Sequence, residues 1–346
     1  MSLGIRFAAL ALGMLISTTV LTAQQNGPPA AAKTSKISLD VVVSAKSGPP
    51  VGGLQQGEFT LLDNKTPRPI TSFKAISEGQ EPVHVILVLD AVNTPYERVA
   101  YARDHMNTFL RANGGHLAQP TSIAIFTDQG TQLGEGFTTD GNQLSAALDR
   151  SAPGLRTIRR SSQWAASDQL HLSLTALGEL VAAEAKIPGR KAIFWVSPGW
   201  PLLSGPHVIL DGRQTDQIFS NIVGLSTEMR EARITLYGVD PLGAAEGVGR
   251  TFYYEDFLKG VSKTSQVALG DLSLQVLSIQ SGGFALSSSN DIVALLQKCM
   301  TDAGAYYEVS FDSPPADRRN EYHSLDIRVD KPGLIARTRQ GYYAQP

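Results

Sequence analysis

The segment from Val83 to Thr94, VHVILVLDAVNT, constrains the fold of this chain more than any other stretch. It is an uninterrupted apolar run rich in β-branched residues, it follows Pro82, and it carries an acidic residue near its end. This pattern predicts a central parallel strand that is buried on both faces. Ligands of open α/β sheets bind where loops leave the carboxyl ends of the strands. Asp90 is therefore the first candidate for a functional residue.

The sequence beyond this strand alternates between short apolar runs and helical patterns. Such alternation predicts a parallel sheet with crossover helices. Further strands are predicted at 121–126, 191–196, 234–239 and 283–287, with an edge strand at 131–137. Predicted helices cover about 95–112, 142–150, 167–186, 215–232, 272–280 and 291–303, and Thr94 is a candidate cap for the first. The predicted fold class is α/β, with a doubly wound, mostly parallel, Rossmann-like sheet over residues 81–303.

Both flanks of this core have a β texture instead. Strands separated by turn residues are predicted at 37–44, 58–62 and 70–76, and again at 306–311, 322–329 and 334–342. Short strands at either end of the chain would leave unpaired edges, and pairing the two sets removes them. Residues 35–80 and 304–346 are therefore predicted to form one small β-sandwich, with the α/β domain inserted between its two parts.

The N-terminus has the pattern of an export signal. Arg6 precedes an apolar stretch from Phe7 to Leu21, which small residues end at Thr22-Ala23. We interpret residues 1–23 as a signal peptide, with an uncleaved anchor as the alternative, and residues 24–34 as a flexible lead-in rich in Pro, Ala and Gln. The expected location is periplasmic or extracellular, with membrane contact only through this signal. Cys299 is the only cysteine, so no intramolecular disulfide can form.

Composition and motifs argue against two classes of function. A formal net charge of -2 gives no electrostatic footprint for nucleic acid. The sequence contains no G-x-S-x-G elbow, no Walker loop and no H-E-x-x-H motif, and its six histidines have no ligand-like spacing. We therefore expect a protein that is not an enzyme and that takes no small-molecule substrate.

The strand followed by Asp-x-x-x-Thr, within an alternating α/β core, resembles the von Willebrand factor type A (VWFA) domain. The flanks sharpen the likeness: VVVSAKSGPPVGGLQQGEFTLLDNKTPRPITSF before the core, then YYEVSF and LDIRVDKPGLIARTRQGYYA after it, resemble VWFA-related proteins abundant in Acidobacteria. The resemblance covers nearly the whole chain after the lead-in. It implies the fold more strongly than a molecular function, since one fold serves many functions.

The resemblance also implies a place for a divalent cation. Such domains hold the ion through Asp-x-Ser-x-Ser after the first strand, a loop Thr, and an Asp after the fourth strand. In this chain Asp90 and Thr94 match the first motif, Val92 replaces its first Ser, and Ser197 replaces the later Asp; Thr157 is a positional match for the loop Thr. Losing oxygen ligands weakens a site for Mg²⁺, Mn²⁺ or Ca²⁺. The expected metal site is degenerate, and the alternative is that Asp90 only hydrogen-bonds the loop.

The same edge of the sheet carries candidate residues for partner binding. Asn93 follows the strand, Trp200 lies beside Ser197, and Tyr253 and Tyr254 lie in a long aromatic loop. The function we expect is an exported binding or adhesion module whose protein partner offers an acidic residue to any bound ion. The alternative is a metal-independent scaffold or envelope-assembly component. An exposed aromatic patch at Trp200 and residues 252–257 would favour the first, and its burial the second.

Overall fold

The computed structural model describes residues 35–46, 48–151, 163–201, 210–243, 253–287 and 289–346. Residues Thr34–Pro346 form one compact unit. The predicted signal peptide and lead-in, and Thr157, lie outside the described residues. Within the described ranges no helix has the length and apolarity that a membrane span requires.

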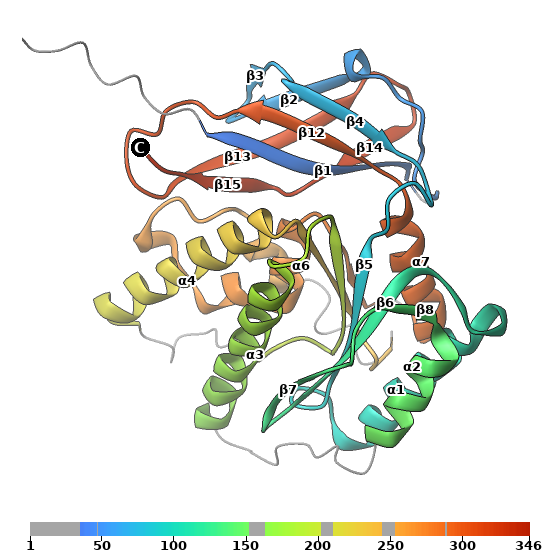
Figure 1. Ribbon diagram of the computed structural model, residues 1–346. Coiled ribbons are helices and arrows are strands. Elements are labelled where there is room, and N and C mark those ends of the chain that lie inside the picture. Colours follow the sequence, from blue (N-terminus) through green and yellow to red (C-terminus); the bar gives the residue numbers. More distant parts are fainter. Residues whose placement is uncertain (1–34, 47, 152–162, 202–209, 244–252, 288) are drawn as a thin grey trace, which may run out of the picture. The chain divides into compact units, whose positions relative to one another are not determined.

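A central sheet in the order β11-β10-β9-β5-β6-β7 organises the α/β part (Figure 1). The Val83–Thr94 segment supplies its middle strand, β5, which pairs in parallel with β6 on one side and β9 on the other. The edge strand β7 is antiparallel, and the short β8 also pairs with β6. The bounds are β5 (His84–Asp90), β6 (His116–Thr127), β7 (Gly130–Leu133), β8 (Thr138–Asp140), β9 (Lys191–Val196), β10 (Ile234–Val239) and β11 (Ala285–Leu286). The doubly wound, mostly parallel sheet is therefore confirmed.

Helices cover both faces of this sheet, and the alternation of side chains along β5 explains why. Val85, Leu87 and Leu89 belong to the core under α1, α2 and α7, whereas Ile86 and Val88 belong to the core under α3, α4 and α6 (Figure 1). The helix bounds are α1 (Tyr96–Arg111), α2 (Gly141–Ser151), α3 (Gln163–Glu184), α4 (Gly212–Glu231), α6 (Leu274–Gln280) and α7 (Ile292–Gly304). Short 3₁₀ turns are η1 (Gln56–Glu58), η2 (Ala112–Gly115), η4 (Tyr253–Phe257), η5 (Thr264–Gln266) and η6 (Leu269–Leu272).

Two antiparallel sheets built from both ends of the chain form the predicted β-sandwich (Figure 1). One has the order β14-β1-β12-β4 and the other β15-β13-β2-β3. Their bounds are β1 (Lys36–Ala45), β2 (Phe59–Asp63), β3 (Thr66–Arg68), β4 (Ser72–Ile76), β12 (Tyr306–Asp312), β13 (Glu321–Val329), β14 (Leu334–Arg337) and β15 (Gly341–Ala344). Strand β1 pairs with β12, so the first and last described segments are joined. Apolar side chains of both sheets form a separate core between them.

Two details of the sequence prediction were wrong. The single strand expected at 334–342 is two strands, because the chain leaves one sheet after Arg337 and enters the other at Gly341. Thr94 does not cap α1: Pro95 occupies the cap position, in agreement with its fixed φ.

An ionic cluster around the buried Asp302 joins the sandwich to the α/β core. Arg337 on β14 donates to both carboxylate oxygens of Asp302 on α7, at 2.5 and 2.6 Å. The Tyr237 hydroxyl, on β10, donates to the same carboxylate at 2.7 Å. The Arg337 guanidinium also lies 3.8 Å from the centre of the Phe284 ring. Since Asp302 is 5% exposed, it requires these partners to remain charged in the interior.

Candidate functional site

Asp90 lies at the carboxyl end of β5, where the sequence placed it. It follows Ile86 and Val88 on the face of the sheet that α3 covers, and it pairs in register with Phe126 of β6. Its exposed fraction is 0%. A carboxylate at this depth needs hydrogen-bond donors to remain ionised, so its function depends on which groups supply them.

Four nitrogen donors surround the Asp90 carboxylate. Oδ1 accepts hydrogen bonds from the backbone N–H groups of Val92, at 3.0 Å, and Asn93, at 2.9 Å. Oδ2 accepts from the Asn93 side-chain amide at 2.8 Å and from the Trp195 indole Nε1 at 2.9 Å. The Ser197 hydroxyl is a further partner. Since a carboxylate offers about four lone-pair positions, the protein itself fills the acceptor capacity of Asp90.

Burial and these donors act on the pKa of Asp90 in opposite directions. Burial penalises the charged form and raises the pKa above its ordinary value, and this effect is the larger. Hydrogen bonds from Asn93, Trp195 and Ser197 favour the carboxylate and limit the rise. The network is thus the reason that an acidic side chain can be held in an apolar core.

Helix α3 fixes the loop that follows Asp90. Its Ser173 hydroxyl accepts a 2.9 Å hydrogen bond from the Asn93 amide, and its Gln169 amide donates to the Val92 carbonyl at 3.1 Å. The loop is therefore anchored from the strand and from the helix.

The fit of a cation to this edge can be judged from its oxygen atoms. Thr94 Oγ1 and Asn93 Oδ1 are hard oxygen atoms that are buried and have no hydrogen-bond partner in the described part of the chain. Val92 adds none. An ion at Asp90 would have to displace the indole N–H, the amide or a backbone N–H, so the carboxylate as held here does not fit a metal ligand. Among the described residues, no group of three or more His, Cys, Asp or Glu side chains could hold a metal ion.

The aromatic residues expected at this edge do not form one exposed face. Trp200 is 2% exposed, and its ring lies edge-on to that of Trp195, with centroids 5.3 Å apart. The structure thus places Trp200 in the core under α3 and α6, directly after Gly199, whose φ is positive. Tyr254 is half-buried and lines a cavity of about 20 Å³ beside Ser197, and the side chain of Tyr253 lies outside the description. Partner binding by these residues stays a prediction.

Tyr96 is an aromatic residue at this edge that the sequence reasoning missed. It begins α1, two residues after Thr94, and its exposed fraction is 66%. Its position in the first turn of a helix that starts at the sheet's carboxyl edge is the signal that could have identified it. Large aromatic side chains are enriched among the residues that contribute most to protein–protein binding.

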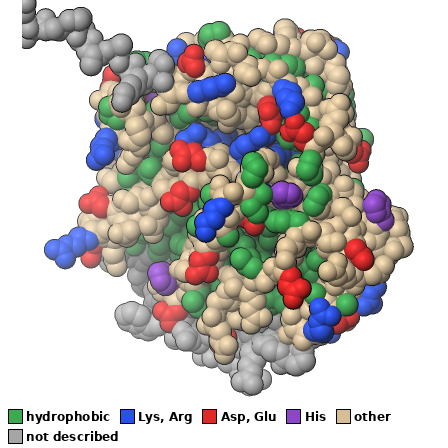
Figure 2. All heavy atoms as spheres, in the orientation of Figure 1, with side chains coloured by type: hydrophobic (Ala, Val, Ile, Leu, Met, Phe, Trp, Pro, Cys, Tyr) green, Lys and Arg blue, Asp and Glu red, His purple; other side chains and the backbone are tan. Residues whose placement is uncertain are grey.

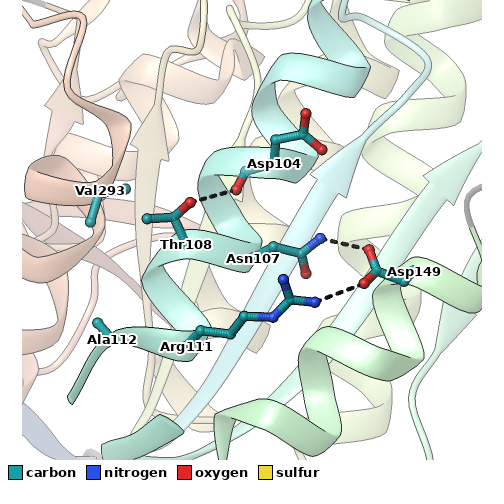
Figure 3. Close-up of a pocket in the computed structure, with 7 residues that line it drawn as sticks. All are labelled: Asp104, Asn107, Thr108, Arg111, Ala112, Asp149 and Val293. Carbon is teal, nitrogen blue, oxygen red and sulfur yellow. Dashed lines mark hydrogen bonds and ion pairs between the residues drawn. The ribbon is translucent and has the colours of Figure 1, made fainter. Parts of the chain in front are cut away.

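The most spacious pocket among those described lies elsewhere, between α1, α2 and α7, and has a volume of about 610 Å³. Figure 3 shows Asn107 and Arg111 turned toward Asp149, whose carboxylate accepts from Asn107 at 2.7 Å and from Arg111 at 2.9 Å. Thr108 donates to the carbonyl of Asp104. The Asp104 carboxylate pairs with Arg103 at 3.3 Å. Since Asn107, Arg111, Asp149 and Asp104 all have partners, the described residues of this pocket do not offer the convergent, unsatisfied groups that mark an active site.

No protein-family model matches the sequence, and no curated protein matches it. The fold is that of a mixed α/β protein with a doubly wound sheet and a β-sandwich. Solved structures similar to it include VWA domains, among them that of SpRpn10, with 14% identity, 62% of this chain and 95% of that chain covered, and a TM-score of 0.29.

Two longer proteins are also similar in structure. The human COPII-coat protein Sec24c shows 9% identity over 78% of this chain and 44% of its own, with a TM-score of 0.38. Proximal thread matrix protein 1 from the mussel byssus shows 10% identity over 70% of this chain and 51% of its own, also with a TM-score of 0.38. The chain thus spans about half the length of these proteins. Likeness at this level concerns the fold and says nothing of function; the narrower resemblance to acidobacterial proteins stays a prediction.

Proposed function

We propose that this protein is a non-enzymatic protein-interaction module whose edge site is held together by hydrogen bonds in place of a metal ion. The observation that carries the proposal is the filled acceptor capacity of the buried Asp90 carboxylate. The Trp195 indole and the Asn93 amide donate to the lone pairs of Asp90 Oδ2 that a cation would need to be free. Export to the periplasm or beyond is part of the proposal and rests on the N-terminal sequence pattern.

The binding surface in this proposal is the loop after β5 together with the start of α1. Anchoring of Asn93 by Ser173 and Asp90 makes the loop rigid, and Tyr96 offers a large exposed ring next to it. Rigid aromatic side chains contribute strongly to protein–protein binding because little side-chain entropy is lost. A partner bound here needs no acidic side chain, since no ion has to be completed.

A metal-independent scaffold is the second candidate, and the burial of Trp200 favours it. The outer strand β14 of the sandwich exposes Ile335 at 56%. An edge strand with an exposed apolar side chain can pair with another chain. In this alternative the contacts of the protein are made by the sandwich and not by the sheet edge that carries Asp90.

Isothermal titration calorimetry of metal-stripped protein with Mg²⁺, Mn²⁺ and Ca²⁺ tests the metal-independent site. We expect no binding below millimolar concentrations for the wild type, for Asp90→Ala, or for Asp326→Ala, an exposed-carboxylate control on β13. Micromolar binding that Asp90→Ala abolishes and Asp326→Ala retains would refute the proposal and restore a metal-dependent adhesion site. Any weak binding that all three proteins share reports unrelated surface carboxylates.

A further inference from the structure

A cluster of three arginines lies where the sandwich meets the α/β core, far along the chain from the Asp90 site. Arg230 is in the last turn of α4, Arg233 follows that helix, and Arg339 lies in the connection between β14 and β15. All three line a cavity of about 10 Å³, together with Asp40 of β1 and Thr235 of β10. Figure 2 shows basic side chains gathered in the band between the sandwich and the helices, with acidic ones among them.

Two of the arginines have carboxylate partners. Arg233 donates to Asp40 at 2.6 Å and also pairs with Glu308 of β12. Arg230 pairs with the neighbouring Glu231 at 3.0 Å. The charge of Arg233 is therefore matched within the protein, whereas that of Arg230 is paired only with an exposed carboxylate.

Arg339 differs from both. It is 8% exposed, and its guanidinium donates one hydrogen bond, to the Ser226 carbonyl of α4 at 3.2 Å. It forms no ion pair with any carboxylate of the described residues. A guanidinium has five N–H donors, so the bond to Ser226 uses only part of its hydrogen-bonding capacity, and Arg339 lines the cavity. Buried charges are ordinarily paired, and this one is not.

The surroundings compensate this charge only in part. The C-terminal end of α4 carries about half a negative charge from its free carbonyl groups. Asp40 also favours the charged form of Arg339, although its carboxylate is already engaged by Arg233, whereas Arg230 repels Arg339. Burial, and then Arg230, lower the pKa of Arg339 to about 9. A bound anion would remove this penalty.

We propose that Arg339 and Arg230 form a binding site for a small oxyanion of the phosphate type, in which Arg339 is the main donor and Arg230 adds positive charge. The cavity admits about one water-sized atom, so one oxygen enters against Arg339 and the rest of the anion lies toward solvent. Planar guanidinium groups suit phosphate oxygens, because two N–H groups can donate in parallel. The Thr235 hydroxyl lines the same space and can donate to the oxygen.

The test compares thermal unfolding in sodium phosphate and in sodium chloride at equal ionic strength, at pH 7. An anion that binds only the folded state raises its melting temperature with concentration. We expect phosphate to stabilise the wild type beyond chloride and to stabilise Arg339→Gln less. Arg328→Gln is the matched control, since Arg328 is an exposed arginine of β13 whose side chain is 65% exposed; it should respond as the wild type does.

Direct binding distinguishes a site from a general salt effect. Phosphate titrated into the folded proteins, followed by calorimetry, should show one site whose affinity falls about 10- to 100-fold in Arg339→Gln, as loss of a charge-assisted hydrogen bond implies. Arg339→Lys keeps the charge and should bind with intermediate affinity. Equal phosphate responses in the wild type, Arg339→Gln and Arg328→Gln would show that phosphate acts only through the solvent, and the proposal would fail.

Discussion

Replacing Trp195 by Phe tests the hydrogen bond that holds Asp90. The substitution removes the indole N–H that donates to Asp90 Oδ2 at 2.9 Å and keeps an aromatic ring in the core. A hydrogen bond to an ionised group contributes about 1.5–3 kcal/mol, and its loss leaves a buried carboxylate short of a donor. The free energy of unfolding should fall by that amount in addition to the loss of packing.

Trp200→Phe is the control for the packing term. Trp195 and Trp200 are 0% and 2% exposed and lie in the same core, so the same atoms are lost from similar surroundings. The indole N–H of Trp200, however, has no hydrogen-bond partner within the described residues. Trp195→Phe should therefore destabilise the protein by at least about 1.5–3 kcal/mol more than Trp200→Phe does.

Urea unfolding followed by far-UV circular dichroism measures both variants without relying on tryptophan fluorescence, which each substitution alters. The midpoint should fall further for Trp195→Phe, with an unchanged slope, since the surface exposed on unfolding is the same. Equal losses for the two variants, within about 0.5 kcal/mol, would mean that the indole hydrogen bond does not stabilise Asp90. The reasoning for a metal-independent site would then lose its main support.

Three further outcomes follow from the structure. Asp302→Asn should destabilise the protein by at least about 1.5–3 kcal/mol in urea unfolding, because it takes the charged acceptor away from Arg337 of β14 and from the buried Tyr237 hydroxyl. Asp326→Asn removes an exposed pair and should cost less than about 1 kcal/mol. Burial raises the pKa of Asp271 to about 6, so the folded state holds a proton that the unfolded chain releases near pH 4. The stability that this group contributes is full below pH 4 and is lost as the pH rises through 6. Between pH 4 and 7, the free energy of unfolding of Asp271→Asn should therefore fall less than that of the wild type. Equal decreases would contradict the raised pKa of Asp271. Gly283→Ala would place its Cβ 1.9 Å from a backbone oxygen of β10 and should lower the melting temperature, while Gly178→Ala in α3 meets no atom within 4 Å and should raise it slightly.

The local pattern of the sequence predicted the elements and their arrangement. The apolar run of β5 required burial on both faces, and the alternation after it required crossover helices. The strands predicted at both ends of the chain had to pair with each other, because they would otherwise have left unpaired edges. Asp90 could be located for the same reason, since a polar residue ending a buried strand must lie at the edge of the sheet. These inferences depend on the periodic spacing of apolar residues, which can be read from residues close together in the sequence.

Only the tertiary structure decided which hydrogen-bond and ion-pair partners each buried polar group has. Trp195, the donor to Asp90, is 105 residues away in sequence, and only the parallel pairing of β5 with β9 brings them together. The same holds for the burial of Trp200 in the core that β9, α3 and α6 share. It also holds for Arg339, which forms no ion pair with a carboxylate in the described part of the chain, as becomes apparent only when α4, β1 and the β14–β15 connection are assembled. Hydrogen bonds and ion pairs form between atoms within about 3–4 Å in space, whereas a sequence pattern records only spacing along the chain.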